Sequence, residues 1–400
     1  MGLAATLAMA YGAKQAMPVL QQLAKPSPYP PAGQQGQGQP GYGAAPPGQS
    51  TPYDGQAAGY YGQPQHAPAG GNYAPNYGAA PSGYNPAYAG AAGAAAGAAA
   101  AYGASHYGQQ QQHGGPVGSH AYILGKLQQC VQDQNLQAFY PPGSLEPIAN
   151  RISQSGALQR IAGEWRLPME IAMDLAKLAL FDVILFLDDS GSMAFEENGS
   201  RIDDVKLIAS RAATAAALFD QDGIQILLMN GHQQGHNINN EQQASQLLSN
   251  IQFSGLTPFG TSLDQRVLQP FVVGPARAGA LRKPVLVIGV TDGEPAGEDP
   301  NAFVQAVKNA KAALSQTRYG PDALSIELAQ VGNDQKARAH LERIDNHPEV
   351  GGLVDVTSTF ENEQDEMMRK TGINLTPDLW LVKLCLGGID SAYDHKDERR

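Results

Sequence analysis

The chain has 400 residues, with 37 acidic and 26 basic side chains and a net charge of −11 at pH 7. This acidity argues against a nucleic-acid surface on the folded part, because phosphate contacts need clustered Lys and Arg. The two cysteines, Cys130 and Cys385, have neither a metal-ligand spacing nor a disulfide framework, and they favour a reducing, cytoplasmic compartment. We expect no membrane-spanning segment, because no run is long and apolar enough.

Residues 1–25 form an apolar segment that lacks the basic start of a secretory signal. Gly2 and Thr6 match the pattern for N-myristoylation. We prefer a short hydrophobic helix or a chance match, because such motifs are brief. If Gly2 is acylated, one acyl chain gives only weak membrane association.

Residues 26–118 are rich in Pro, Gly, Gln, Ala and Tyr and contain no Leu, Ile or Phe. Such a segment buries too little apolar surface to offset its backbone entropy, so we expect a disordered, low-complexity arm. Spaced tyrosines in a nearly uncharged polar sequence are typical of self-association. Two interpretations stay open: an arm that condenses or binds partners, and a solubilising spacer.

Residues 119–180 are predicted to form a small helical region, because their apolar residues recur at helical spacing. Its last helix begins at Pro168, a residue suited to a first helical turn. In that helix Asp174 and Lys177 are spaced to form an ion pair, which we expect on the exposed side.

From residue 181 the pattern changes to short apolar runs that alternate with helices. The predicted strands are 181–187, 223–230, 284–291, 324–332 and 353–358. They are apolar on both faces, as parallel strands covered by helices should be. The alternation predicts an α/β fold over residues 181–375, a doubly wound, mostly parallel sheet flanked by helices. Residues 376–400 are predicted to form an apolar helix packed on the sheet, followed by a charged tail.

Oxygen-bearing side chains follow the predicted strands, where sheets of this class bind their ligands. Asp188, Ser190 and Ser192 come after the first strand, Thr257 lies in the loop "SGLTPFGTSLD", and Asp292 follows the strand "PVLVIGVT". An all-oxygen set suits Mg²⁺, Mn²⁺ or Ca²⁺, whereas Zn²⁺ prefers nitrogen and sulfur. The sequence therefore predicts a site for a hard divalent cation.

A serine nucleophile is the alternative interpretation of "DDSGSM". The elbow motif Gly-x-Ser-x-Gly is absent, and a triad also needs a histidine within reach. His232 and His236 are the nearby candidates, but Gly231 and Gly235 favour a polar surface loop there. A metal-dependent hydrolase would need a general base, for which the sequence offers no candidate beyond the ligands. We therefore expect a protein that is not an enzyme.

The motifs "DDSGSM", "GLTPFGTSL" and "VTDGEP" resemble, in this order, the three parts of the metal-ion-dependent adhesion site of von Willebrand factor A domains. The similarity covers about half of the chain and extends, less specifically, to intracellular fungal proteins of this superfamily. It implies that Ser190, Ser192 and Thr257 bind the cation through their hydroxyls. It also implies that Asp188 and Asp292 act mostly through coordinated water and hydrogen bonds.

Some residues depart from the family pattern. Leu256 stands where many members have glycine, and the nearby Thr261 could replace Thr257 as a ligand. We favour Thr257, because the preceding Ser-Gly pair puts it at the usual place in the motif. Asp189 is expected to be exposed and to add negative charge without binding the cation.

The resemblance implies a metal-dependent protein-binding module in which an Asp or Glu of a protein partner completes the cation's coordination. Neutral hydroxyl ligands would leave the cation's charge available to such a carboxylate. The alternative is a scaffold that acts mainly through residues 26–118, with a degenerate metal site.

Overall fold

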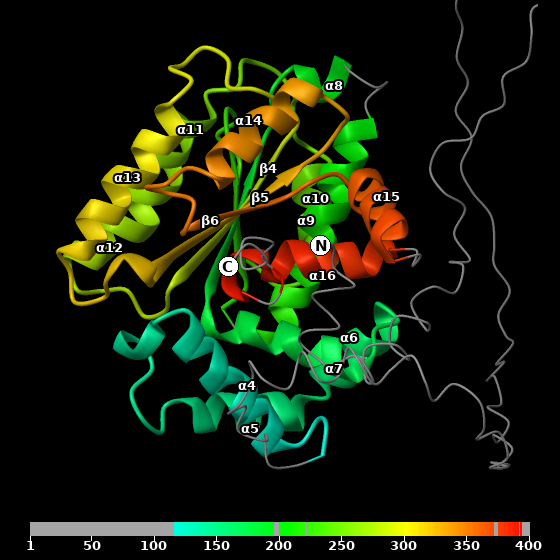
Figure 1. Cartoon of the computed structure of the whole chain (residues 1–400), viewed down its shortest axis with the longest axis vertical. Helices are drawn as coiled ribbons and strands as arrows, with labels where there is room; N and C mark the ends of the chain where they lie inside the picture. The colour runs from blue at the N-terminus through cyan, green and yellow to red at the C-terminus, as the bar shows by residue number, and fades with distance from the viewer. Residues whose placement is uncertain (1–115, 196–199, 221, 372–374, 392, 394–400) are drawn as a thin grey trace, which may run out of the picture. The chain divides into compact units, whose positions relative to one another are not determined.

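The computed structural model describes residues 116–195, 200–220, 222–371, 375–391 and 393 (Figure 1). The apolar N-terminal segment and nearly all of the predicted arm lie outside these residues, as does the end of the charged tail. No helix in the described ranges is long and apolar enough to cross a membrane.

A six-stranded sheet with the order β3-β2-β1-β4-β5-β6 forms the centre of the described part. Its strands are β1 (Asp182–Leu187), β2 (Ile224–Leu228), β3 (Gln234–Ile238), β4 (Val285–Thr291), β5 (Leu324–Gln330) and β6 (Val354–Thr357). Every neighbouring pair is parallel except β2 with β3. The predicted α/β class, with its mostly parallel sheet, is thereby confirmed.

The antiparallel edge strand β3 replaces part of the surface loop that we expected around His232 and His236. It pairs only with β2, and three of its five residues are exposed. The apolar run that marks the other strands is therefore missing from its sequence. Gly235 belongs to the strand, where it pairs with Ile226. A Cβ at this position would come within 2.8 Å of the Leu247 side chain, so the packing of α10 favours glycine there.

Helices cover both faces of the sheet (Figure 1). One face carries α9 (Ser200–Phe219), α10 (Glu241–Leu248) and α16 (Pro377–Leu386), with α15 (Phe360–Thr371) beside α16. The other face carries α11 (Phe259–Leu263), the π-helix η4 (Asp264–Val273), α12 (Gly274–Arg277), α13 (Ala302–Ser315) and α14 (Gln335–Asp345). The predicted apolar C-terminal helix is α16, and its packing against β5 is confirmed.

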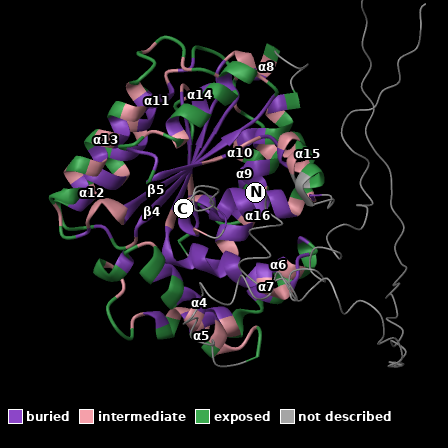
Figure 2. Ribbon diagram, in the orientation of Figure 1, coloured by how far each residue is buried: buried purple, intermediate pink, exposed green. Residues whose placement is uncertain are grey.

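Successive side chains along the strands point to opposite faces of the sheet and belong to two apolar cores, one on each face. The strands and the inward sides of the helices are buried (Figure 2). In β1, Val183, Leu185 and Leu187 belong to the core beneath α9 and α16, whereas Ile184 and Phe186 belong to the opposite core. Both cores are needed because a parallel sheet with helical crossovers leaves neither face in water.

The predicted helical region consists of α4 (His120–Asp133), η1 (Leu136–Ala138), α5 (Leu145–Ser155), α6 (Ala157–Glu164), α7 (Met169–Asp174) and η2 (Leu175–Leu180). The last predicted helix is thus a short α-helix that continues as a 3₁₀ helix. These elements share one apolar core with α9, α16 and a face of the sheet.

The Asp174–Lys177 pair forms, with 3.3 Å between Oδ1 and Nζ, but its predicted exposure is wrong. Both side chains are buried, because the end of the chain covers them. Lys177 also pairs with Asp390, Lys126 lies 3.1 Å from Asp174, and the Tyr393 hydroxyl donates to Asp174 at 3.1 Å. Helical spacing within one segment cannot reveal a cover that comes from more than 200 residues later.

Candidate metal site

The first and third predicted motifs meet at the carboxyl edge of the sheet. Because β1 and β4 are parallel neighbours, the loops that follow them begin side by side. The hydroxyl oxygens of Ser190 and Ser192 lie 3.0 Å apart, and Ser192 donates a hydrogen bond to Asp292 Oδ1 at 3.1 Å. Asp188 Oδ1 accepts a hydrogen bond from the Ser190 backbone N–H at 2.8 Å. Four of the five predicted ligand residues are therefore linked in one hydrogen-bonded group.

Asp188 is completely buried in this group. Its second carboxylate oxygen accepts a hydrogen bond from the Thr291 hydroxyl at 2.7 Å. Burial, and secondly the charge of Asp292, raise the pKa of Asp188 to about 6. The site thus concentrates negative charge where water cannot screen it, which favours a bound cation.

The loop that carries Thr257 is tied to both other loops. Gly191 N–H donates to Gly255 O at 3.1 Å, and Ala296 N–H donates to Thr257 O at 3.0 Å. Thr257 is buried at 6% exposure, whereas Thr261 is exposed in α11. The hydrogen bond from Ala296 holds Thr257 beside the loop that follows β4, and the role of Thr257 as a ligand stays a prediction.

Leu256, the departure from the family pattern, turns outward with 61% of its surface exposed. The sharp turn before it is made by Gly255, whose φ of +100° favours glycine. The Leu256 carbonyl accepts a hydrogen bond from Asn230 Nδ2 at 2.9 Å, which holds the loop against the segment after β2. A leucine is accommodated here because its side chain does not enter the oxygen group.

The expectation that Asp189 is exposed is wrong, since only 1% of the residue is accessible. Its two carboxylate oxygens accept hydrogen bonds from the backbone N–H groups of Asn230 and Gly231, both at 2.7 Å. The chain after β2 folds back over Asp189, a tertiary contact that the local sequence does not reveal. Asp189 therefore holds two neighbouring strand ends together.

Arg201 at the start of α9 is a residue of this site that the sequence did not identify. Its Nη1 donates to Asp292 Oδ2 at 2.7 Å, and both side chains are buried. A Cβ on Gly332 would lie 2.3 Å from Arg201 Nε, so glycine leaves the room that the guanidinium occupies. In the sequence, an arginine in the first turn of a helix is indistinguishable from a solvated surface residue.

A second acidic group lies at the amino-terminal edge of the sheet. Ligand oxygens of Asp182, Asp220 and Asp222 all lie within 4.8 Å of one another, close enough to hold a metal ion. However, Lys283 pairs with Asp220, and its ammonium lies 3.7 Å from both Asp182 and Asp222. The lysine already supplies the positive charge, so the geometry favours an ion-pair cluster.

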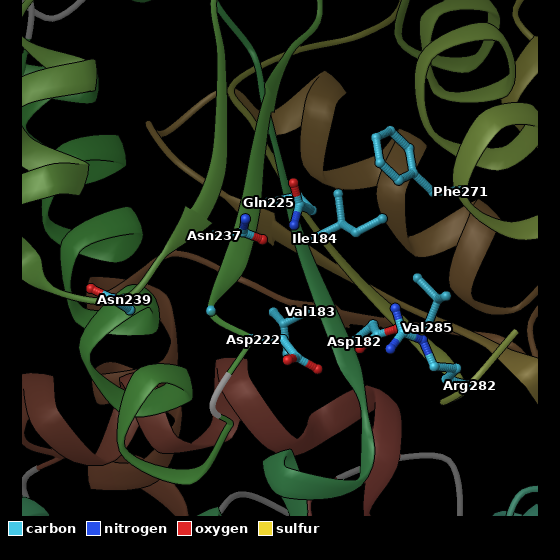
Figure 3. A pocket seen from close by; sticks show the side chains of 11 residues that line it. Asp182, Val183, Ile184, Asp222, Gln225, Asn237, Asn239, Phe271, Arg282 and Val285 are labelled. Carbon is cyan, nitrogen blue, oxygen red and sulfur yellow. The ribbon is translucent and has the colours of Figure 1, made fainter.

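A polar cavity of about 470 Å³ adjoins this cluster (Figure 3). Its lining includes Asp182, Asp222, Gln225, Asn237, Phe271 and Arg282. It lies at the opposite end of β1 from Ser190 and Ser192, so it takes no part in the predicted metal site.

Comparisons with protein-family models and with curated proteins found no match for this sequence.

The role of Asp189 gives a testable consequence. Replacing it by alanine leaves two backbone N–H groups without their acceptor, which should lower the free energy of unfolding by about 1–3 kcal/mol. Urea denaturation of the parent, Asp189→Ala and the exposed control Asp365→Ala measures this loss. Equal stability of the two variants would contradict the structural role of Asp189.

Proposed function

We propose that this chain is a von Willebrand factor A-type protein that captures a protein partner through a divalent cation and is not an enzyme. One observation carries the proposal. Ser190, Ser192 and Asp292 come from loops 100 residues apart and form one hydrogen-bonded group at the carboxyl ends of adjacent parallel strands. Ligands of such sheets bind at this edge.

The donor atoms fit Mg²⁺ or Mn²⁺. We assign the hydroxyls of Ser190, Ser192 and Thr257 as direct ligands, and Asp188 and Asp292 as residues that act through water. A set made only of oxygen suits a hard cation, with Ca²⁺ as a further candidate. When bound, the cation would supply an open coordination position for a carboxylate oxygen. The chain's own contribution is to hold the Ser190 and Ser192 hydroxyls 3.0 Å apart and to keep both aspartates ordered by hydrogen bonds.

Arg201 changes the charge balance of the proposed site. By pairing with Asp292 it offsets one of the two nearby carboxylates. A cation bound here would be less neutralised by the protein, so the protein alone would bind it more weakly. For the same reason the cation would attract an external carboxylate more strongly.

Apolar residues beside the oxygen group support a protein partner. Among the described residues, five large apolar side chains are exposed, and two of them lie beside this site. Phe195 ends the short helix α8 (Ser192–Phe195), and Leu256 belongs to the loop that carries Thr257. Exposed apolar side chains next to a polar centre are typical of protein interfaces. An Asp or Glu of the partner would bind the cation while its neighbours contact these two side chains.

A second candidate function is a scaffold that acts mainly through the low-complexity residues 26–118. The Arg201–Asp292 pair favours it, because an arginine can stabilise the acidic group without any metal. We propose a cytoplasmic location in either case, since the described cysteines, Cys130 and Cys385, are both free and buried. Weak membrane association through Gly2 remains part of the proposal only if that residue is acylated.

Metal binding separates the two candidates. Asp188→Ala and Ser190→Ala should each weaken Mn²⁺ binding by roughly 10–100-fold or more, because both remove atoms that bind or position the ion. Calorimetric titration of the full chain measures this, with circular dichroism to establish that each variant folds. The control Asp222→Asn alters the other acidic cluster and should bind as the parent does. Parent-like binding by Asp188→Ala would assign the metal to another place.

Partner capture should depend on the cation and on one partner carboxylate. Binding to a partner in pull-downs should be lost in EDTA, restored by Mg²⁺ or Mn²⁺, and nearly unchanged between moderate and high salt. The chain's charge of −11 repels acidic partners, but salt screens that repulsion beyond about 8 Å, whereas a direct metal–carboxylate bond is not screened. Binding that resists EDTA would assign the interaction to another surface, foremost the tyrosine-rich arm.

A further inference from the structure

Two buried carboxyl groups face each other beneath the C-terminal helix. Glu327 in β5 and Asp355 in β6 are register partners in neighbouring parallel strands. They are 0% and 4% exposed. Both lie on the face of the sheet that α16 and the following 3₁₀ turn η6 (Gly387–Ile389) cover. This pair takes no part in the proposed metal site.

The oxygens of this pair are short of hydrogen-bond donors when both acids are ionised. Within the described part of the chain, neither Glu327 oxygen has a partner of good hydrogen-bond geometry, and neither does Asp355 Oδ2. The Thr357 hydroxyl is a neighbouring donor that favours the ionised form of Glu327. Burying a carboxylate without a donor is strongly unfavourable, so two adjacent ones require either a proton or a cation between them.

The charged groups near Glu327 and Asp355 supply too little positive charge to balance both acids in their ionised form. Lys383 on α16 is buried and pairs with Glu363 on α15 at 2.9 Å. Cys385, also on α16, carries no charge at neutral pH, since burial raises the pKa of its thiol to about 12. Among the described residues, Glu327, Asp355 and Glu363 therefore share the ammonium group of Lys383.

The backbone of η6 lies close to both carboxyl groups. A Cβ built on Gly387 would be 2.1 Å from Asp355 Oδ2 and 2.5 Å from Glu327 Oε2. The Gly387 backbone thus rests directly against both carboxyl oxygens. This close approach favours a proton between the two acids over an ion with a coordination shell.

We propose that Glu327 is protonated at neutral pH and donates its proton to Asp355, so that the pair forms a buried proton-binding site that joins the C-terminal segment to the sheet. Consistent with this, burial first, and then the charge of Asp355, raise the pKa of Glu327 well above its usual value, while the hydroxyl of Thr357 and the charge of Lys383 oppose the shift.

The proton makes folding dependent on pH. An acid whose pKa is raised by folding holds its proton in the folded state after the unfolded chain has released it. Its contribution to stability is therefore complete below the usual glutamate pKa of 4.5 and is lost as the pH rises toward the folded pKa. Within that interval the equilibrium constant for unfolding should rise by up to about tenfold per pH unit because of this one group.

Infrared spectroscopy of the full chain carrying ¹³C-labelled glutamate detects the proton directly. The parent should show the carbonyl band of a protonated glutamic acid at pH 7, and the band should disappear in Glu327→Gln. The matched control Glu361→Gln, an exposed acid on α15, should keep it. A parent without this band, or a band that survives in Glu327→Gln, would overturn the proposal.

Urea unfolding between pH 5 and pH 9 supplies the second measurement. Glu327→Gln keeps a neutral donor toward Asp355 but cannot release a proton. The unfolding constant of this variant should therefore rise less steeply with pH than that of the parent, and the two slopes should differ by up to about tenfold per pH unit. Glu361→Gln should follow the parent. Identical slopes for all three proteins would overturn the proposal. Loss of the parent's pH dependence on addition of Na⁺, Mg²⁺ or Ca²⁺ would also overturn it, because the site would then bind a cation and not a proton. If Glu327→Gln fails to fold, the pH titration of the infrared band in the parent decides alone.

Discussion

The parallel pairing of β1 with β4 is the constraint on which the rest of this structure depends. Because of this pairing, the loops that contain Asp188 and Asp292 begin at the same carboxyl edge of the sheet, although the two residues are 104 positions apart in the sequence. The hydrogen bond between Ser192 and Asp292 follows from this adjacency. An antiparallel neighbour would have sent one of the loops to the opposite edge of the sheet.

Two buried ion pairs fix the C-terminal segment to the rest of the described structure. Asp390 pairs with Lys177 beside the helical region, and Lys383 pairs with Glu363 above the sheet. Buried pairs of this kind add little net stability, but loss of one partner typically costs about 3–5 kcal/mol, since the other charge is left uncompensated. The charged residues thus select the position of α16, while its apolar side chains supply most of the favourable free energy.

Sequence reasoning predicted the features that leave a local pattern. The apolar strands and their α/β order follow from short-range periodicity, and the oxygen group follows from motifs at strand ends. It failed where the deciding contact comes from far along the chain. Asp189 is buried by the segment after β2, Arg201 reaches Asp292, and β3 carries little apolar signal because it pairs on one side only. The acidic cluster around Lys283 was missed for the same reason, because its members come from three separate segments.

We propose that the oxygen group, and not the acidic cluster at the opposite edge, holds a divalent cation. Anomalous diffraction from crystals of the protein soaked in Mn²⁺ tests this proposal. We expect an anomalous peak within bonding distance of the Ser190 and Ser192 hydroxyls. A peak only beside Asp182 and Asp222, or no peak at a Mn²⁺ concentration that saturates binding in solution, would contradict it.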